Sequence, residues 1–209
     1  WNISKDKRIK PVVIINKVTI GGVDISRVTG NNARYIKDNG IGIDAQVEII
    51  RSGDVIPKIV KVIKKVKPLF PKVDYEWDKN NVEIKVIGNN IEDVNIKNIY
   101  YFFSQLDTKG MGEKIVRKLY ENKINTIEKI LKMKKNELLD IEGFKEKSAD
   151  NLIKSIKKAV SDKSLAEIMN ASNKLGSGMG IERMKMITST YPKILTNNWS
   201  KKELIEKIK

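Results

Sequence analysis

The sequence predicts a multidomain β + α protein: a small β-rich domain, then a short β-hairpin connector, then an all-α array. Two changes in hydrophobic pattern predict this order. In residues 1–66 apolar and polar residues alternate in short runs separated by Gly, Pro and Asn, as in β-strands. In residues 94–209 apolar residues recur at helical spacing, as on the buried face of α-helices. The intervening residues 67–93 alternate again, after Pro68 and Pro71.

The first 66 residues carry four or five strand patterns and one short helical pattern. The strand patterns are clearest at 11–15, 23–26, 46–50 and 59–63. Gly21-Gly22 marks a tight turn, and residues 31–38 suit one short helix ended by Asn39-Gly40. This set fits a small Greek-key barrel of the OB type, a fold that often binds nucleic acid. The pattern alone also allows an SH3-like barrel.

Residues 67–93 are expected to form a β-hairpin that connects the two parts. Residues 75–77 and 82–86 alternate on either side of Asn80-Asn81, which suits a polar turn. The segment is too short to be a domain, so its aromatic residues are expected to pack on a neighbour. The predicted parts are therefore 1–66, 67–93 and 94–209.

The helical part repeats one motif three times. Each copy precedes a predicted helix, and the copies are 33 and 35 residues apart: Gly110-Met111-Gly112, Gly143-Phe144-Lys145 and Gly178-Met179-Gly180. The pattern is typical of the turn in a helix-hairpin-helix. The first glycine permits a positive φ, the hydrophobic residue fills the crease between the helices, and the second glycine opens backbone N–H groups to a phosphate. Lys145 replaces that second glycine in the middle copy.

A basic residue follows each copy, and Lys114, Lys147 and Arg183 can add a charge-assisted bond to phosphate. One copy would be weak evidence, because glycine ends many helices, but three at near-equal spacing favour nucleic-acid binding. Phosphate contacts carry no base information, so binding should be independent of sequence. If a handful of phosphates is neutralised, affinity should fall on the order of a thousandfold between low and moderate salt.

A second candidate contact lies in residues 51–57, R-S-G-D-V-I-P. Gly53 belongs to a Gly-Asp turn, and Val55 and Ile56 place aliphatic tips near Arg51. This combination suits a surface that touches both the phosphates and the groove wall of a duplex. The alternatives are a solvated arginine at a strand end and aliphatic residues in the core of an edge strand.

The charge balance also favours a polyanionic partner. The chain carries 41 Lys and Arg against 26 Asp and Glu, a net charge of +15, and two basic blocks flank a net acidic stretch at 69–93. A general bias toward lysine is the alternative. The absence of Cys and His excludes disulfides, thiolate zinc sites and His-based catalysis. No membrane span or signal peptide is predicted, and an intracellular setting is expected.

With these motifs, the chain resembles the C-terminal half of an NAD-dependent DNA ligase over nearly its whole length. The family's barrel carries the patterns G-R-T-G-x-x-T-P-V, G-x-x-V-S-x-A-T-L-H-N and R-A-G-D-V-I-P. Residues 4–12 (S-K-D-K-R-I-K-P-V), 22–32 (G-V-D-I-S-R-V-T-G-N-N) and 51–57 stand at these places without gaps. Residues 141–149 (I-E-G-F-K-E-K-S-A) match the family's second hairpin, I-E-G-F-x-x-K-S-A.

The chain departs from this family at several places. The family usually holds zinc with four cysteines between barrel and hairpins; residues 67–93 have none, so no zinc is expected and the hairpin there takes its place by packing. In lacking these cysteines the chain is similar to a divergent, zinc-less branch of the family, such as its viral members. Lys5 and Asp6 replace Arg-Thr, which keeps the charge, loses the planar fork and adds a carboxylate that repels phosphate. A fourth hairpin would begin near Lys209, so it is expected to be truncated.

The resemblance implies a clamp on nicked double-stranded DNA, with the barrel in the minor groove near the nick and the hairpins on the backbone. The residues that it assigns to DNA binding are Lys5, Arg8, Arg51, Gly53, Val55, Ile56, Gly110, Gly112, Lys114, Gly143, Lys145, Lys147, Ser148, Gly178, Gly180 and Arg183.

No catalytic residue and no metal site are expected in this chain. The family's nucleophilic lysine lies in a K-x-D-G motif of an N-terminal adenylation domain, and no such motif occurs here. The chain, which begins at Trp1 and not Met, is therefore expected to be an inactive, monomeric fragment that binds no cofactor. NAD and Mg²⁺ are implied for the parent enzyme, which seals nicks in replication and repair in the cytoplasm or nucleoid, or in the host cytoplasm if viral.

The alternative is a non-catalytic binder of DNA structures. The Holliday-junction-binding subunit of the branch-migration machinery also joins an OB barrel to helix-hairpin-helix repeats. The match at residues 51–57 favours the ligase, and a K-x-D-G motif upstream of Trp1 in the reading frame would decide.

Overall fold

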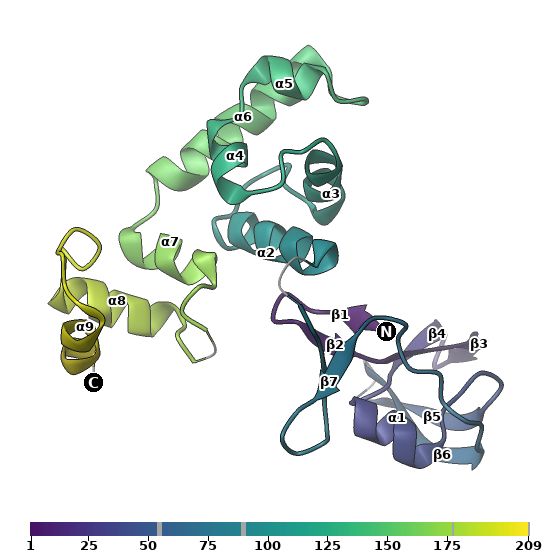
Figure 1. Ribbon diagram of the computed structural model, residues 1–209. Helices are drawn as coiled ribbons and strands as arrows, with labels where there is room; N and C mark the ends of the chain where they lie inside the picture. Colours follow the sequence, from purple (N-terminus) through teal and green to yellow (C-terminus); the bar gives the residue numbers. More distant parts are fainter. Residues whose placement is uncertain (54–55, 89–90, 177, 209) are drawn as a thin grey trace. The chain divides into compact units, whose positions relative to one another are not determined.

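The structure, a computed structural model, describes residues 1–53, 56–88, 91–176 and 178–208. The chain divides into two compact units, Trp1–Val94 and Asn95–Lys209 (Figure 1). Strands form the first unit together with one helix, and helices form the second, so the predicted β + α class is confirmed. None of the described helices is both long and apolar enough to span a bilayer.

The first unit contains eight described strands and one helix. Their bounds are β1 Asn2–Ile3, β2 Arg8–Lys10, β3 Val12–Ile20, β4 Val23–Thr29, α1 Ala33–Asn39, β5 Gln46–Ser52, β6 Ile56–Lys64, β7 Tyr75–Trp77 and β8 Ile84–Val86. The strands pair antiparallel as β1-β2-β8-β7, β3-β4 and β5-β6. Within the described residues these three sheets do not close into one hydrogen-bonded barrel. The β3-β4 and β5-β6 sheets share a core with α1, built from Ile25, Val28, Ile36, Ile41 and Ile59.

Local signals fixed the connections of this unit as the sequence predicts. Gly21-Gly22 joins β3 to β4 with both glycines at positive φ, which suits a two-residue hairpin turn. Helix α1 begins after Asn32, whose side chain accepts a 2.8 Å bond from the Tyr35 N–H. It ends at Gly40, whose φ of 62° lets its backbone N–H donate to the carbonyls of Ile36 and Lys37 in the last turn.

The hairpin at 75–86 belongs to the first unit. Strand β8 pairs with β2, and the side chains of Ile9, Ala33, Ile84 and Val86 form a second small core. Its aromatic rings do pack on a neighbour, as expected. Phe70 stacks on Trp1 with ring centroids 5.3 Å apart and lies 6.0 Å from Tyr75 and 5.9 Å from Trp77. The hairpin therefore extends the sheet of the first unit and covers its aromatic cluster.

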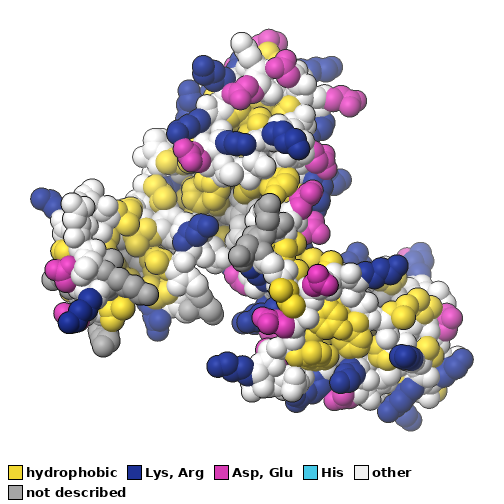
Figure 2. All heavy atoms as spheres, in the orientation of Figure 1, with side chains coloured by type: hydrophobic (Ala, Val, Ile, Leu, Met, Phe, Trp, Pro, Cys, Tyr) yellow, Lys and Arg dark blue, Asp and Glu magenta, His cyan; other side chains and the backbone are white. Residues whose placement is uncertain are grey.

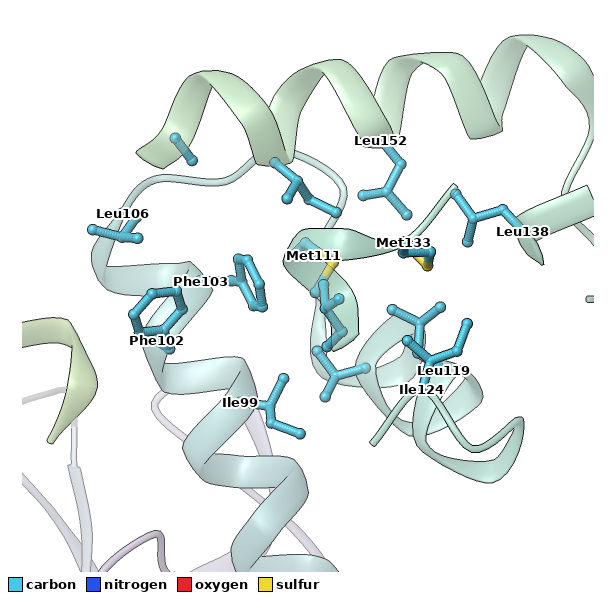
Figure 3. Packing of buried hydrophobic residues seen from close by; sticks show 14 of the residues in the cluster. Ile99, Phe102, Phe103, Leu106, Met111, Leu119, Ile124, Met133, Leu138 and Leu152 are labelled. Carbon is cyan, nitrogen blue, oxygen red and sulfur yellow. The ribbon is translucent and has the colours of Figure 1, made fainter. Parts of the chain in front are cut away.

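The second unit is an all-α array. Its helices are α2 Glu92–Gln105, which starts in the first unit, α3 Glu113–Glu121, α4 Ile127–Lys132, α5 Lys135–Leu139, α6 Glu146–Ser161, α7 Leu165–Ser172, α8 Ile181–Thr190 and α9 Lys201–Ile208. One continuous core joins α2 to α7, and Figure 3 shows its centre around Phe103, Met111 and Leu152.

One helical face differs from the prediction. The sequence suggests that Tyr100 shares the buried face of α2 with Ile96, Ile99 and Phe103, but Tyr100 is 37% exposed and Phe102 is 4% exposed. Phe102 instead meets Phe103 edge-on at 5.1 Å. Both positions fit a helical period, and the phenol tolerates water better than a phenyl ring does, so tertiary packing decides between them.

Candidate nucleic-acid interface

The three predicted hairpin turns share one backbone geometry. The first glycine of each copy is left-handed, with φ of 84° at Gly110, 88° at Gly143 and 86° at Gly178. An L side chain there would cost about 1 kcal/mol. The prediction that these glycines permit a positive φ is therefore confirmed, and the backbone itself accounts for them.

The central hydrophobic residue anchors each turn. Met111 is buried, and Figure 3 shows it among core residues that include Phe103 and Leu152. Phe144 packs against the same core and Met179 is half-buried. The hydrophobic residue of each turn thus faces the helical unit, while the residues on either side of it are exposed to solvent.

The third motif position, the second glycine in the outer copies, is the N-cap of the following helix in all three copies. Gly112 caps α3 with φ −69° and Gly180 caps α8 with φ −80°, both conformations that any residue can adopt. A Cβ built on either glycine would meet no atom within 4 Å. Neither backbone strain nor internal packing therefore requires glycine at these two places. A ligand outside the chain that needs close approach to the backbone would explain both.

The middle copy differs from the outer two in its hydrogen bonds. The Lys145 N–H donates to Ser148 Oγ at 2.9 Å, and that hydroxyl donates back to the Lys145 carbonyl at 2.8 Å. Gly112 and Gly180 have no such side-chain cap. The sequence predicts that Lys145 and Ser148 both bind DNA, and in the structure they also hydrogen-bond each other at the N-terminus of α6.

The basic residues that follow the three turns are exposed, as a phosphate contact requires. Lys114 and Lys147 lie on the first turns of α3 and α6. The side chain of Arg183 on α8 points back toward its own hairpin turn. Its Nη1 atom lies 3.6 Å from the position that a Cβ on Gly178 would take. The first turn of α8 therefore brings a guanidinium close to the third hairpin.

Lys118 is a residue that sequence reasoning did not single out. Its ammonium group, on α3, donates to the carbonyl of Glu142 in the second turn, and a Cβ on Gly143 would lie 2.9 Å from Nζ. Lys118 thus ties the helix of the first hairpin to the turn of the second. Nothing in helical periodicity signals this contact, because its partner is a backbone atom 24 residues away.

The predicted turn of the first unit lies between β5 and β6, and its residues separate onto two faces. Cα pairing sets Arg51 opposite Pro57 and Ser52 opposite Ile56, so Arg51 and Ile56 occupy opposite faces of the ribbon. Ile56 is 54% exposed. Gly53 has φ of 60° and open space around it. Val55 lies outside the described residues.

Arg51 is held by the neighbouring hairpin turn. Its Nη1 donates to the carbonyls of Ile20 at 3.2 Å and Gly21 at 3.3 Å. A guanidinium carries five N–H donors in a planar fork, so binding two carbonyls through one nitrogen orients the remainder of the group. The β3–β4 turn thereby sets the position of the arginine, a role for Gly21 that the sequence did not indicate.

Lys5 and Arg8, the two N-terminal residues predicted to bind DNA, are engaged in solvent-accessible ion pairs. Lys5 Nζ lies 3.1 Å from Asp6, and Arg8 lies 3.2 Å from Glu83 on the hairpin. Exposed pairs of this kind contribute roughly 0–1 kcal/mol and can exchange their partner for a phosphate. In the described part of the chain, no three Asp or Glu side chains gather as a metal site would require.

A β-rich unit with a basic turn, followed by repeated hairpin turns, defines the class of OB-fold and helix-hairpin-helix proteins. Residues 1–69 match the family model of the NAD-dependent DNA ligase OB-fold domain, and residues 106–158 match that of the SAM-like helix-hairpin-helix tandem.

Relatives extend the likeness over the whole chain. A DNA ligase of Acanthamoeba polyphaga mimivirus is 37% identical over 98% of this chain and 34% of its own length. A putative DNA ligase of Invertebrate iridescent virus 3 is 35% identical over 93% of this chain and 26% of its own. A Campylobacter jejuni DNA ligase is 35% identical over 75% of this chain and 26% of its own length. The chain belongs to the NAD-dependent DNA ligase family, is similar to its viral members almost throughout, and spans about a third or less of these relatives.

Proposed function

We propose that this chain is the DNA-clamping part of an NAD-dependent DNA ligase, which binds nicked duplex DNA through backbone and minor-groove contacts. One observation carries the proposal. Gly112 and Gly180 cap two hairpin helices with ordinary φ angles and open space where a Cβ would stand. A glycine that the fold does not need, at the N-terminus of a helix, suits the close approach of a phosphate.

The outer hairpins then hold the backbone through main-chain N–H groups. Lys114 and Arg183 lie within the first turn of the same helices and add charge. The middle hairpin contributes differently, because the Lys145 N–H is already donated to Ser148. There the ammonium groups of Lys145 and Lys147 act as point charges.

The first unit approaches the minor groove with its β5–β6 turn. Ile56 presses on sugars and base edges, and Val55 of the same turn is proposed to do so with it. This contact favours a locally widened groove. Arg51, held at the carbonyls of Ile20 and Gly21, brings its guanidinium to a phosphate beside the nick. Lys5 and Arg8 exchange their carboxylate partners for further phosphates.

The chemistry of sealing belongs to the rest of the parent enzyme in this proposal. NAD and Mg²⁺ would act in an adenylation domain of the same polypeptide, and this chain alone would bind no cofactor and join no ends. Its residues keep the two ends of the nick in register, so that the 3′-hydroxyl lies in line with an activated 5′-phosphate. We propose that 1–66, 67–93 and 94–209 correspond to the barrel, the replacement for the zinc-binding segment and the hairpin domain.

The test is a binding titration of the whole 209-residue chain with nicked duplex, intact duplex and a four-way junction at several salt concentrations. We expect preference for the nicked duplex. Gly112→Val and Gly180→Val should each lower affinity by about tenfold, since valine would occupy the space of a phosphate, while unfolding free energy changes by about 1 kcal/mol. Lys145→Val is the matched control, because that position already carries a side chain; it should lose only the effect of one charge.

Two outcomes would contradict the proposal. Unchanged affinity in both glycine variants would remove the hairpins from the interface. Preference for the four-way junction over the nicked duplex would favour a non-catalytic DNA-structure binder. In the parent enzyme, Arg51→Ala should slow sealing and leave enzyme adenylation intact; unchanged sealing would refute the role of Arg51.

A further inference from the structure

The outward face of the β5–β6 ribbon carries aliphatic and basic side chains together. Ile50, Ile56 and Val60 are 45%, 54% and 50% exposed, and Lys58 lies among them. Figure 2 shows hydrophobic and basic side chains next to one another on the visible surface of this unit. Single exposed aliphatics are common, but three around one lysine on one ribbon face form a patch.

Strand register places these side chains on one face. Ile50 pairs with Lys58, and Ser52 pairs with Ile56, so both pairs share a side of the ribbon. Directly paired residues have Cβ atoms about 5 Å apart and diagonal ones about 8 Å apart, which makes the patch continuous. The register shift between Glu48 and Ile49 leaves Val60 on the same exposed side.

Charge limits the patch at one end. Glu48 pairs with Lys61, so a carboxylate faces an ammonium there. Lys58 faces Ile50 instead, and β6 contains no acidic residue. Among the described residues, the part of the ribbon nearest Gly53 is therefore both apolar and positively charged.

From these observations we propose that Ile50, Lys58 and Val60 form a second contact surface for the sugar-phosphate backbone of duplex DNA, continuous with the turn that holds Ile56. A DNA strand presents apolar deoxyribose next to anionic phosphate, which is the complement of aliphatic side chains around a lysine. The inference rests on the proposed function, and it assigns contacts to the ribbon as well as to its turn. Among the described residues, strand pairing sets Ile50 and not a carboxylate opposite Lys58, so the patch favours an anionic partner.

The test compares two lysines of the same strand in the whole chain with nicked duplex. Lys58→Glu should lower affinity about tenfold and reduce the slope of log K against log salt by about one contact. Lys64→Glu makes the same change in net charge about 20 Å along the strand and should lower affinity less than about twofold. Lysine acylation followed by mass spectrometry should find Lys58 protected by duplex and Lys64 not.

An aliphatic variant separates a DNA surface from a protein surface. Ile50→Thr keeps a β-branched side chain and should weaken duplex binding by about threefold, with Ile63→Thr on the partner strand β6 as the exposed control. Equal losses for Lys58→Glu and Lys64→Glu, or equal acylation with and without duplex, would overturn the inference while leaving the clamp intact. Normal duplex binding by Ile50→Thr with slower adenylation of the parent enzyme would assign the patch to a protein partner. A wild-type chain that does not bind nicked duplex would instead refute the proposed function itself.

Discussion

Changing the two glycines of the β3–β4 turn separately would test how Arg51 is positioned. Gly21 and Gly22 both have positive φ, 58° and 74°, but their surroundings differ. A Cβ on Gly21 would lie 3.0 Å from Arg51 Nη1, whereas a Cβ on Gly22 would meet nothing within 4 Å. Gly21→Ala therefore disturbs the arginine, and Gly22→Ala changes the turn without touching it.

The two variants should cost the same stability and differ in binding. Alanine at a positive φ costs about 1 kcal/mol at either place, because an L side chain disfavours that region. Gly21→Ala must also move the guanidinium by a few tenths of an ångström. The bonds to Ile20 and Gly21 are already 3.2 and 3.3 Å long, so a small shift takes one of them out of hydrogen-bonding range. A phosphate contact that depends on this orientation should weaken by about 1.4 kcal/mol, which is tenfold in affinity.

Fluorescence anisotropy with a labelled nicked duplex would measure the difference, and thermal unfolding would check that both variants lose similar stability. We expect Gly21→Ala to bind about tenfold more weakly than Gly22→Ala, and Arg51→Ala to abolish the difference between the two. Equal affinities for the two glycine variants would show that the turn does not position Arg51.

Three further predictions concern stability and the middle hairpin. Hydrogen bonds from Ser164 lower the pKa of Glu167 from 4.5 to about 2. The carboxylate therefore contributes to folding stability above pH 4.5, and this contribution is lost as the pH falls toward 2. Denaturant unfolding at these two pH values should show a smaller loss of stability for Glu167→Gln than for wild type. Phe70→Ala should lower the free energy of unfolding of the first unit by about 2–4 kcal/mol, because three aromatic neighbours lose a partner, and calorimetry would measure it. Lys145→Gly should lose the charge but open a backbone site, so the salt dependence of DNA binding should fall while affinity at moderate salt is retained; a loss equal to that of Lys145→Val would contradict this.

Features encoded in neighbouring residues could be predicted from the sequence. The Gly40 stop and the Gly21-Gly22 turn each follow from the conformations that a few adjacent residues prefer. The three hairpin turns follow for the same reason, since a positive φ at Gly110, and at its equivalents, is a local requirement.

Contacts between distant segments could not be predicted in this way. Alternation identifies β8 as a strand but does not say that it pairs with β2, about 75 residues earlier, because many registers satisfy one hydrophobic face. The acceptors of Arg51 and Lys118 are backbone carbonyls, which every residue has, so sequence carries no signal for them. The separation of Arg51 from Ile56 depends on ribbon register, and residues 51–57 alone do not determine it.

The surroundings of the glycines add information that the hairpin motif in the sequence does not contain. Four of the 13 glycines have an ordinary φ, and packing explains two of them. A Cβ on Gly30 would lie 2.7 Å from Pro11, and one on Gly42 would lie 2.3 Å from the Lys67 carbonyl. The other two are Gly112 and Gly180, for which neither angle nor neighbour gives a reason. Lys145 shows that the equivalent backbone accepts a side chain. We therefore propose that a ligand outside the chain accounts for glycine at these two positions, and a helix N-terminus on a strongly basic protein favours an anion.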